Sequence, residues 1–95
     1  MRDAENVDQA GTEKEWKARG FSCGQWIDPP GQEWNDFSHG VDELFMLVEG
    51  ELELEISGRT FRPKSGEEVL IPAQAAHSVR NVGGGSARWL YGYKR

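Results

Sequence analysis

The sequence has few of the residues that cross-link a chain or bind metals. It contains one cysteine, Cys23, and only two histidines among 95 residues. A single cysteine excludes a disulfide within the chain, and nothing in the pattern indicates an oxidising compartment. No apolar run approaches the ~20 residues of a membrane span, and the N-terminal residues lack the apolar segment of a signal peptide. We therefore expect a cytoplasmic protein with no membrane partner.

Positive charge is also scarce. The net charge is −5, and no basic stretch exceeds two consecutive residues, so nucleic acid is not an expected partner. The apolar share of 37% and the four Trp, four Phe and two Tyr residues instead predict a folded globular chain. This length suits one domain with one modest core, which a partner subunit often helps to stabilise.

Residues 1–19 form a polar and charged arm before any regular strand pattern begins. The segment "TEKEWKARG" predicts a short helix, with Thr12 as N-cap, Glu15 at the capping-box position and Gly20 as the stop. Trp16 is the expected anchor of this arm on the rest of the protein. The remainder of the arm is expected to be mobile.

From residue 20 onward the chain consists of short strand-like runs separated by turn residues. "FSCGQWI" alternates and is halted by "DPPG", because tandem proline cannot continue a strand ladder. "DELFMLV" and "ELELEIS" predict a hairpin with its turn at Glu49-Gly50. "GEEVLIP", "AHSVRNV" and "SARWLYGY" follow as further strands. Many short strands at close spacing predict an all-β sandwich or barrel over residues 20–95.

The run from residue 44 to residue 48 is apolar on both faces. Leu44, Met46 and Val48 alternate with Phe45 and Leu47. Such a strand must be covered on both sides, either by a second sheet or by a second subunit. A homodimer is therefore our expectation.

Three residues carry the potential chemistry: His39, Glu43 and His77. On one straight strand His39 and Glu43 would lie about 13 Å apart, too far to share an ion. The intervening Gly40-Val41-Asp42 has the composition of a bend, which would turn both side chains inward. Pro72 ends the run before His77 in a similar way. On this reasoning alone, the three residues are either a metal site or unrelated surface groups.

Two spaced motifs around these residues resemble those of the cupin family. The first runs glycine, five residues, His-x-His, three or four residues, glutamate, six residues, glycine; the second runs glycine, five residues, Pro-x-Gly, two residues, histidine, three residues, asparagine. The matching positions here are Gly31, Phe37-Ser38-His39, Glu43 and Gly50, then Gly66, Pro72-Ala73-Gln74, His77 and Asn81. The resemblance covers roughly residues 20–95.

The resemblance implies a small jelly-roll barrel, the double-stranded β-helix, preceded by the short arm. It also implies a divalent ion, Fe, Mn, Zn or Ni, normally held by three histidines and one glutamate. This chain departs from the family at two positions, with Phe37 in place of the first histidine and Gln74 in place of a glycine. The remaining set, His39, Glu43 and His77, has the composition of a two-histidine, one-carboxylate facial triad. It is also the composition of a site that no longer holds metal.

The expected cavity beside these residues has aromatic and polar walls. We expect it to be lined by Phe37, Gln74, Phe45, Cys23, Trp34 and Trp89. For Cys23 the alternative is a buried structural thiol, and for the aromatic residues it is a place in the core or in a dimer contact. Two functions remain open. One is a metal-dependent small-molecule enzyme, such as an oxygenase or isomerase, and the other is a non-catalytic ligand-binding or regulatory module.

Overall fold

The computed structural model describes residues 7–95, which form one helix and eight strands. The first six residues of the predicted arm lie outside this range. The elements are α1 (Gln9–Ala18), β1 (Gly24–Asp28), β2 (Glu33–Phe37), β3 (Glu43–Glu49), β4 (Leu52–Ile56), β5 (Arg59–Phe61), β6 (Glu68–Ile71), β7 (His77–Asn81) and β8 (Ala87–Tyr93).

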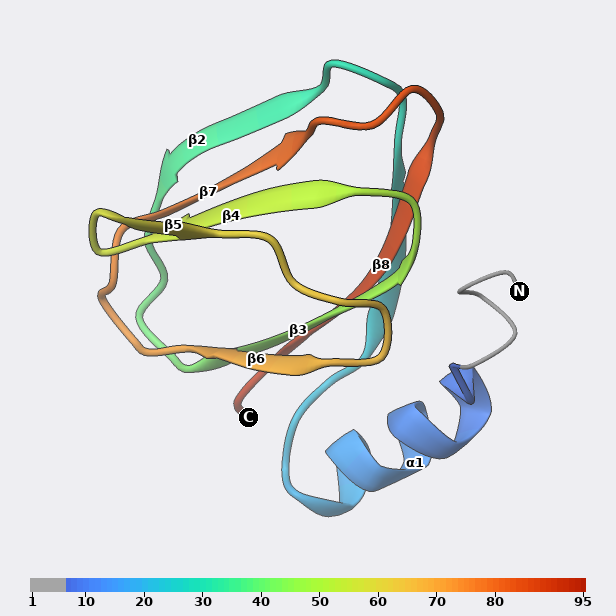
Figure 1. Cartoon of the computed structure of the whole chain (residues 1–95). Helices are drawn as coiled ribbons and strands as arrows, with labels where there is room; N and C mark the ends of the chain where they lie inside the picture. The colour runs from blue at the N-terminus through green and yellow to red at the C-terminus, as the bar shows by residue number, and fades with distance from the viewer. Residues whose placement is uncertain (1–6) are drawn as a thin grey trace.

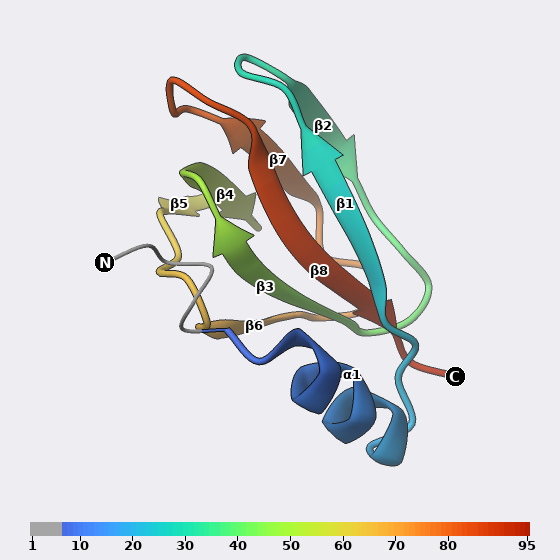
Figure 2. The same ribbon diagram turned by 90° about the vertical axis from the view of Figure 1, so that its right-hand side faces the viewer.

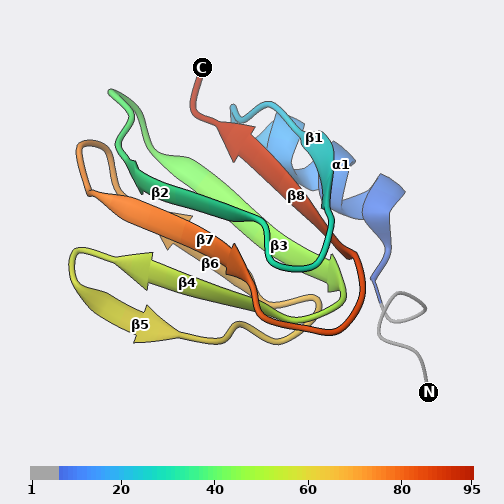
Figure 3. The ribbon, with the colours of Figure 1, turned by 90° about the horizontal axis from the view of Figure 1, so that it is seen from above.

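The strands form two four-stranded antiparallel sheets that face each other (Figures 1 and 3). Their strand orders are β1-β8-β3-β6 and β2-β7-β4-β5. Strands that are consecutive along the chain mostly lie in different sheets, so the chain crosses repeatedly from one layer to the other. This is the jelly-roll sandwich predicted from the strand pattern and the motifs.

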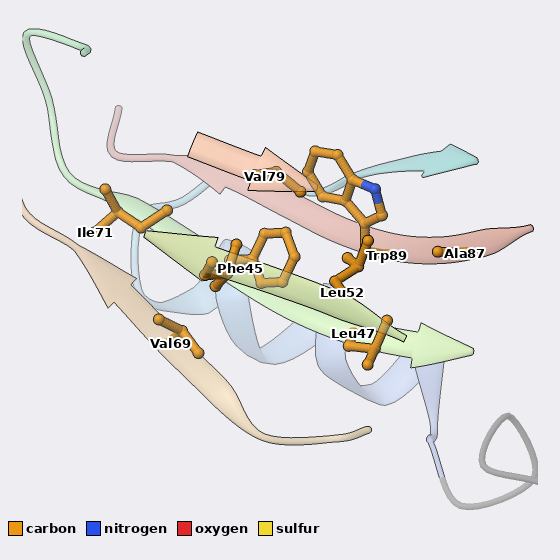
Figure 4. Packing of buried hydrophobic residues seen from close by; sticks show 9 residues of the cluster. Phe45, Leu47, Leu52, Val69, Ile71, Val79, Ala87 and Trp89 are labelled. Atoms are coloured by element: carbon orange, nitrogen blue, oxygen red, sulfur yellow. The ribbon is translucent and has the colours of Figure 1, made fainter. Parts of the chain in front are cut away.

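The main core lies between the two sheets. Phe45 and Leu47 of β3 contact Leu52 and Leu54 of β4 there, and Trp89 of β8 closes the same cluster. Figure 4 shows Phe45, Leu47, Leu52 and Trp89 between the strands of the two layers. The alternation of apolar and polar residues along β4 therefore directs its leucines into the sandwich.

The opposite face of β3 is covered by α1, as Figure 2 shows. Leu44, Met46 and Val48 form a second cluster with Trp16, whose side chain is completely buried. The Trp16 indole also donates a hydrogen bond to Glu68 at 3.0 Å. Trp16 therefore anchors the helix on the sheet, as predicted. We expected a second sheet or a second subunit to cover this face of β3, but α1 of the same chain covers it.

The N-cap of the helix lies four residues before Thr12, the predicted N-cap. Asp8 caps it instead, because its carboxylate accepts a hydrogen bond from the Gly11 amide at 2.9 Å. Aspartate is at least as favourable an N-cap as threonine. The earlier start adds about one turn to the predicted helix. Gly20 follows the last turn with a φ of 90° and ends the helix as predicted.

The predicted hairpin between β3 and β4 is wrong. β3 pairs with β6 and β8, whereas β4 pairs with β5 and β7 in the other sheet. Gly50 has the expected positive φ, 98°, but it serves a crossover between sheets. A Cβ atom at this position would lie 2.8 Å from both the Ala87 Cα and the Ser86 carbonyl oxygen, so the crossover has room only for glycine.

Candidate metal centre

The three candidate ligands come from different segments that meet at one end of the sandwich. His39 lies in the loop after β2, Glu43 is the first residue of β3, and His77 is the first residue of β7. β2 and β7 belong to one sheet and β3 to the other, so the site lies between the two layers. This is the inward convergence that the sequence predicts.

The bend between His39 and Glu43 is fixed by hydrogen bonds to neighbouring loops. The Gln74 amide donates to the His39 carbonyl at 2.7 Å, and the Lys94 amide donates to the Asp42 carbonyl at 2.9 Å. The Asp42 carboxylate accepts from the Ala73 amide at 2.8 Å. The bonds from Gln74 and Ala73 hold the His39 loop on the loop that precedes His77, which places both imidazoles beside Glu43.

The spacing of the side-chain atoms suits a single small cation. The Glu43 Oε1 atom lies 3.3 Å from His39 Nε2 and 3.5 Å from His77 Nε2. One ligand atom from each residue lies within 4.8 Å of the other two. Ligands with metal bonds of about 2.1 Å lie about 3.0 to 3.4 Å apart in octahedral or tetrahedral geometry. The two distances from Glu43 match this range, whereas a separation as wide as 4.8 Å must shorten before all three atoms can bind one divalent ion.

Glu43 is a buried carboxylate without a hydrogen-bond donor. Its side chain is only 5% exposed, and Oε1 has no hydrogen-bond partner among the described residues. Burial raises the pKa of Glu43 to about 7. A buried polar atom left without a partner is costly, so this oxygen requires either a proton or a cation.

Both imidazoles present their Nε2 atom to Glu43. The Nδ1 atom of His77 lies 3.2 Å from the Ala75 carbonyl oxygen, which can only accept, so Nδ1 carries the proton in this hydrogen bond. The lone pair of Nε2 is then directed toward Glu43, an arrangement typical of metal-binding histidines. Burial, followed by the proximity of His77, lowers the pKa of His39. The lowered pKa of His39 and the Nδ1 hydrogen bond of His77 therefore suit both rings to bind a cation.

A cavity of about 280 Å³ opens beside this cluster. It is lined by Trp26, Trp34, Phe37, His39, Glu43, His77, Val79, Trp89, Tyr91 and Tyr93. Phe37 pairs with His77 across β2 and β7, with 6.4 Å between ring centroids. An apolar ring thus stands beside the site where the motif has a histidine.

The structure separates the six predicted lining residues into two groups. Phe37, Trp34 and Trp89 line the cavity, whereas Phe45, Cys23 and Gln74 are not among its lining residues. Phe45 is fully buried and stacks on Trp89 at 4.8 Å within the core. Cys23 packs against the outer cluster beside α1, where burial raises the pKa of its thiol. Gln74 is an exposed loop residue with a φ of 70° and supports the site through its backbone amide.

Two features of the site were not predicted from the sequence. Trp89, Tyr91 and Tyr93 alternate along β8 and share the cavity face, a period of two that could have revealed Tyr93. Asp28 is 1% exposed and accepts hydrogen bonds from the indoles of Trp26, Trp34 and Trp89 at 2.7, 3.0 and 3.1 Å. In the sequence, Asp28 is indistinguishable from a turn residue because it precedes Pro29-Pro30.

Comparison with known proteins identifies the family. The sequence model of the cupin domain family matches residues 24–93, which is most of the chain. The chain belongs to the cupin family. The cupin domain of Cnp3 from Schizosaccharomyces pombe superposes with a TM-score of 0.73 at 24% identity, over 79% of this chain and 56% of that one. That likeness supports the same fold.

Two curated proteins are more than 30% identical to this chain over the residues that match. The polyketide synthase CurC of Streptomyces cyaneus is 35% identical over 63 residues, which are 65% of this chain and 41% of that protein. A 5-nitrosalicylic acid 1,2-dioxygenase of Bradyrhizobium sp. is 33% identical over 64 residues, 67% of this chain and 31% of that protein. This cupin therefore spans less than half the length of the curated relatives that it matches.

Proposed function

We propose that this cupin holds one divalent metal ion with His39, Glu43 and His77 and binds a small molecule in the aromatic cavity beside them. The observation that supports the proposal is the buried Glu43 Oε1 atom, which faces two imidazole nitrogens and has no hydrogen-bond donor. Iron, manganese, zinc and nickel all suit two imidazoles and a carboxylate. When bound, such an ion would act as a Lewis acid toward a substrate oxygen or, if it is iron, activate dioxygen.

The residues around the proposed ligands exclude water and orient the bound molecule. Phe37 and Trp34 form one wall of the cavity, with 6.1 Å between ring centroids and a tilt of 51° between the rings. Tyr93 lies edge-on to His39 at 4.9 Å. Burial, followed by the charge of Glu43, raises the pKa of Tyr93, so its hydroxyl stays protonated and can donate a hydrogen bond at neutral pH. An oxygenase or isomerase reaction is consistent with such a site, and one relative is a dioxygenase.

A binding module without metal is the second candidate function. Phe37 occupies the position of a family ligand, and a glutamate with a pKa of about 7 can satisfy its buried oxygen with a proton instead of a cation. In that case the cavity would bind a small molecule without changing it. Metal content separates the two candidates.

The test is metal analysis of the purified chain after dialysis against chelator and reloading. We expect about one equivalent of a divalent ion for the wild type and a large loss for His39→Ala, Glu43→Gln and His77→Ala. Glu49→Gln is the matched control, because Glu49 lies on the same strand but is exposed and paired with Arg88. Less than about one tenth of an equivalent in the wild type, or unchanged content in the three variants, would reject the metal site.

A homodimer and a cytoplasmic location remain predictions. No helix in residues 7–95 is long and apolar enough to cross a membrane. Ile27 on β1 and Leu70 on β6 are 56% and 53% exposed on the two edge strands of one sheet, which supports pairing of that sheet with a second copy. Light scattering during gel filtration measures the mass, and the mass of a single chain at micromolar concentration would contradict the dimer.

A further inference from the structure

The indole nitrogens of the cavity wall are already occupied within the protein. Trp26, Trp34 and Trp89 come from three strands, and each indole N–H donates to the carboxylate of Asp28. An indole nitrogen is a donor only, so none of the three has a hydrogen-bonding group left for a bound molecule. The wall that they form presents only ring carbon and π surface to the cavity.

Asp28 is held firmly enough to keep this wall in place. It is 1% exposed, and its backbone carbonyl accepts a hydrogen bond from Asn81 Nδ2 at 3.2 Å. The two carboxylate oxygens divide the donors, with Trp26 and Trp34 on Oδ1 and Trp89 on Oδ2. The indole rings are therefore fixed before any ligand arrives, which reduces the entropy cost of binding.

The rings stand at large angles to one another around the cavity. Trp26 and Trp34 meet edge to face at 6.0 Å and 75°, and Trp89 and Tyr91 meet at 5.9 Å and 62°. Walls of this kind offer both edges and faces to a flat ring inserted between them. No lysine or arginine is among the residues that line the cavity in the described part of the chain. An anionic group would find no partner along the wall.

The polar groups left for a bound molecule are the cluster of His39, Glu43 and His77 and the hydroxyls of Tyr91 and Tyr93. The cavity volume, about 280 Å³, lies just below the ~300–1,000 Å³ usual for ligand pockets. A molecule of one ring, or two fused rings, fits this space.

We infer that the cavity takes an uncharged planar aromatic molecule of one or two rings that carries an oxygen substituent at one edge. The rings bind between the tryptophans and Phe37. The direction of the oxygen toward His39, Glu43 and His77 rests on the proposed metal site, whereas the preference for a flat ring rests on the wall alone.

Calorimetry with three probes of similar size tests this inference. The probes are 2-naphthol, its saturated analogue decahydro-2-naphthol, and the cation N-methylquinolinium. Each is titrated into the full chain loaded with zinc and into the chain in chelator. We expect 2-naphthol to bind at least about tenfold more tightly than both other probes, and more tightly still when zinc is present.

Phe37→Ala and Phe61→Ala form a matched pair of variants for the same titrations. Phe37 lines the cavity and is 40% exposed, whereas Phe61 is 37% exposed on β5 and is not among the lining residues. Both truncations leave the buried core intact, so neither is expected to prevent folding. We expect Phe37→Ala to weaken 2-naphthol binding about three- to tenfold and Phe61→Ala to leave it unchanged.

Three results would overturn the inference: equal affinity for 2-naphthol and its saturated analogue, tighter binding of the cation, or equal effects of the two variants. Zinc binding, measured separately on the same samples, tests the proposed function. Selective 2-naphthol binding without zinc binding would reject the metal site and keep the aromatic ligand. Zinc binding without selectivity for 2-naphthol would keep the metal site and reject the aromatic ligand.

Discussion

Glu43 combines burial and charge in a way that should couple the stability of the fold to pH. Its carboxyl group has a pKa of about 7 in the folded chain against 4.5 in the unfolded chain, because burial disfavours the charged form. Between these two pH values the folded state binds more protons than the unfolded state. The free energy of unfolding contributed by Glu43 must therefore fall as pH rises from about 4.5 to about 7.

Replacing Glu43 with glutamine should remove this dependence. In chelator at pH 8, we expect Glu43→Gln to be more stable than the wild type by about 1–3 kcal/mol, and at pH 4.5 we expect the two to be nearly equal. Urea denaturation followed by tryptophan fluorescence measures the difference. Adding zinc at pH 8 should reverse the order, because only the wild type keeps all three proposed ligands. Parallel stability curves from pH 4.5 to pH 8 would show that the burial of Glu43 has no such cost.

The candidate site was largely predictable at the scale of single residues, and its surroundings were not. Motif spacing identified His39, Glu43 and His77, because turns in the backbone bring the motif residues together at one end of the sandwich. The wall of the cavity depends on which strands face each other. Asp28 illustrates the limit: its three donors are 2, 6 and 61 residues away along the chain. No local pattern predicts that these three indoles meet one carboxylate.

At the scale of elements, local patterns located six of the eight strands in residues 7–95, missed β2 and β5, and wrongly paired β3 with β4. Local alternation and turn residues locate strands because the signal lies within a few neighbouring residues. Pairing also depends on contacts distant in the chain. The Glu49-Gly50 turn suits a hairpin equally well, but pairing β3 with β8 lets Leu44, Met46 and Val48 contact α1 while Phe45 enters the main core.

The crossover at Gly50 can be tested against a second glycine with similar backbone geometry. Gly50 and Gly58 have φ values of 98° and 84°, but only Gly50 would place a Cβ atom within 4 Å of other atoms. We expect Gly58→Ala to cost about 1 kcal/mol from backbone strain alone, and Gly50→Ala at least about 2 kcal/mol more. Equal losses in urea denaturation would mean that the close approach of Ala87 does not restrict the crossover.

At the scale of the whole molecule, α1 supplies the second layer of the outer core. Trp16 is completely buried against Leu44, Met46, Val48 and Leu90, 28 to 74 residues further along the chain. Without the helix, this face of the sheet would be exposed apolar surface of the kind that promotes association. The helix itself has few apolar residues apart from Trp16, so one side chain carries most of its attachment.

Trp16→Ala should therefore loosen the helix and weaken the whole fold together. We expect a loss of about 3–5 kcal/mol in the free energy of unfolding, which is large for a chain of this size. Lys17→Ala is the control, because Lys17 is exposed on the same helix and its side chain forms an i,i+4 ion pair with Glu13. Hydrogen exchange should show faster exchange of the α1 amides in Trp16→Ala but not in Lys17→Ala. If Trp16→Ala unfolds at the same urea concentration as the wild type, α1 is not part of the cooperative unit, and the outer face of β3 must be stabilised in another way.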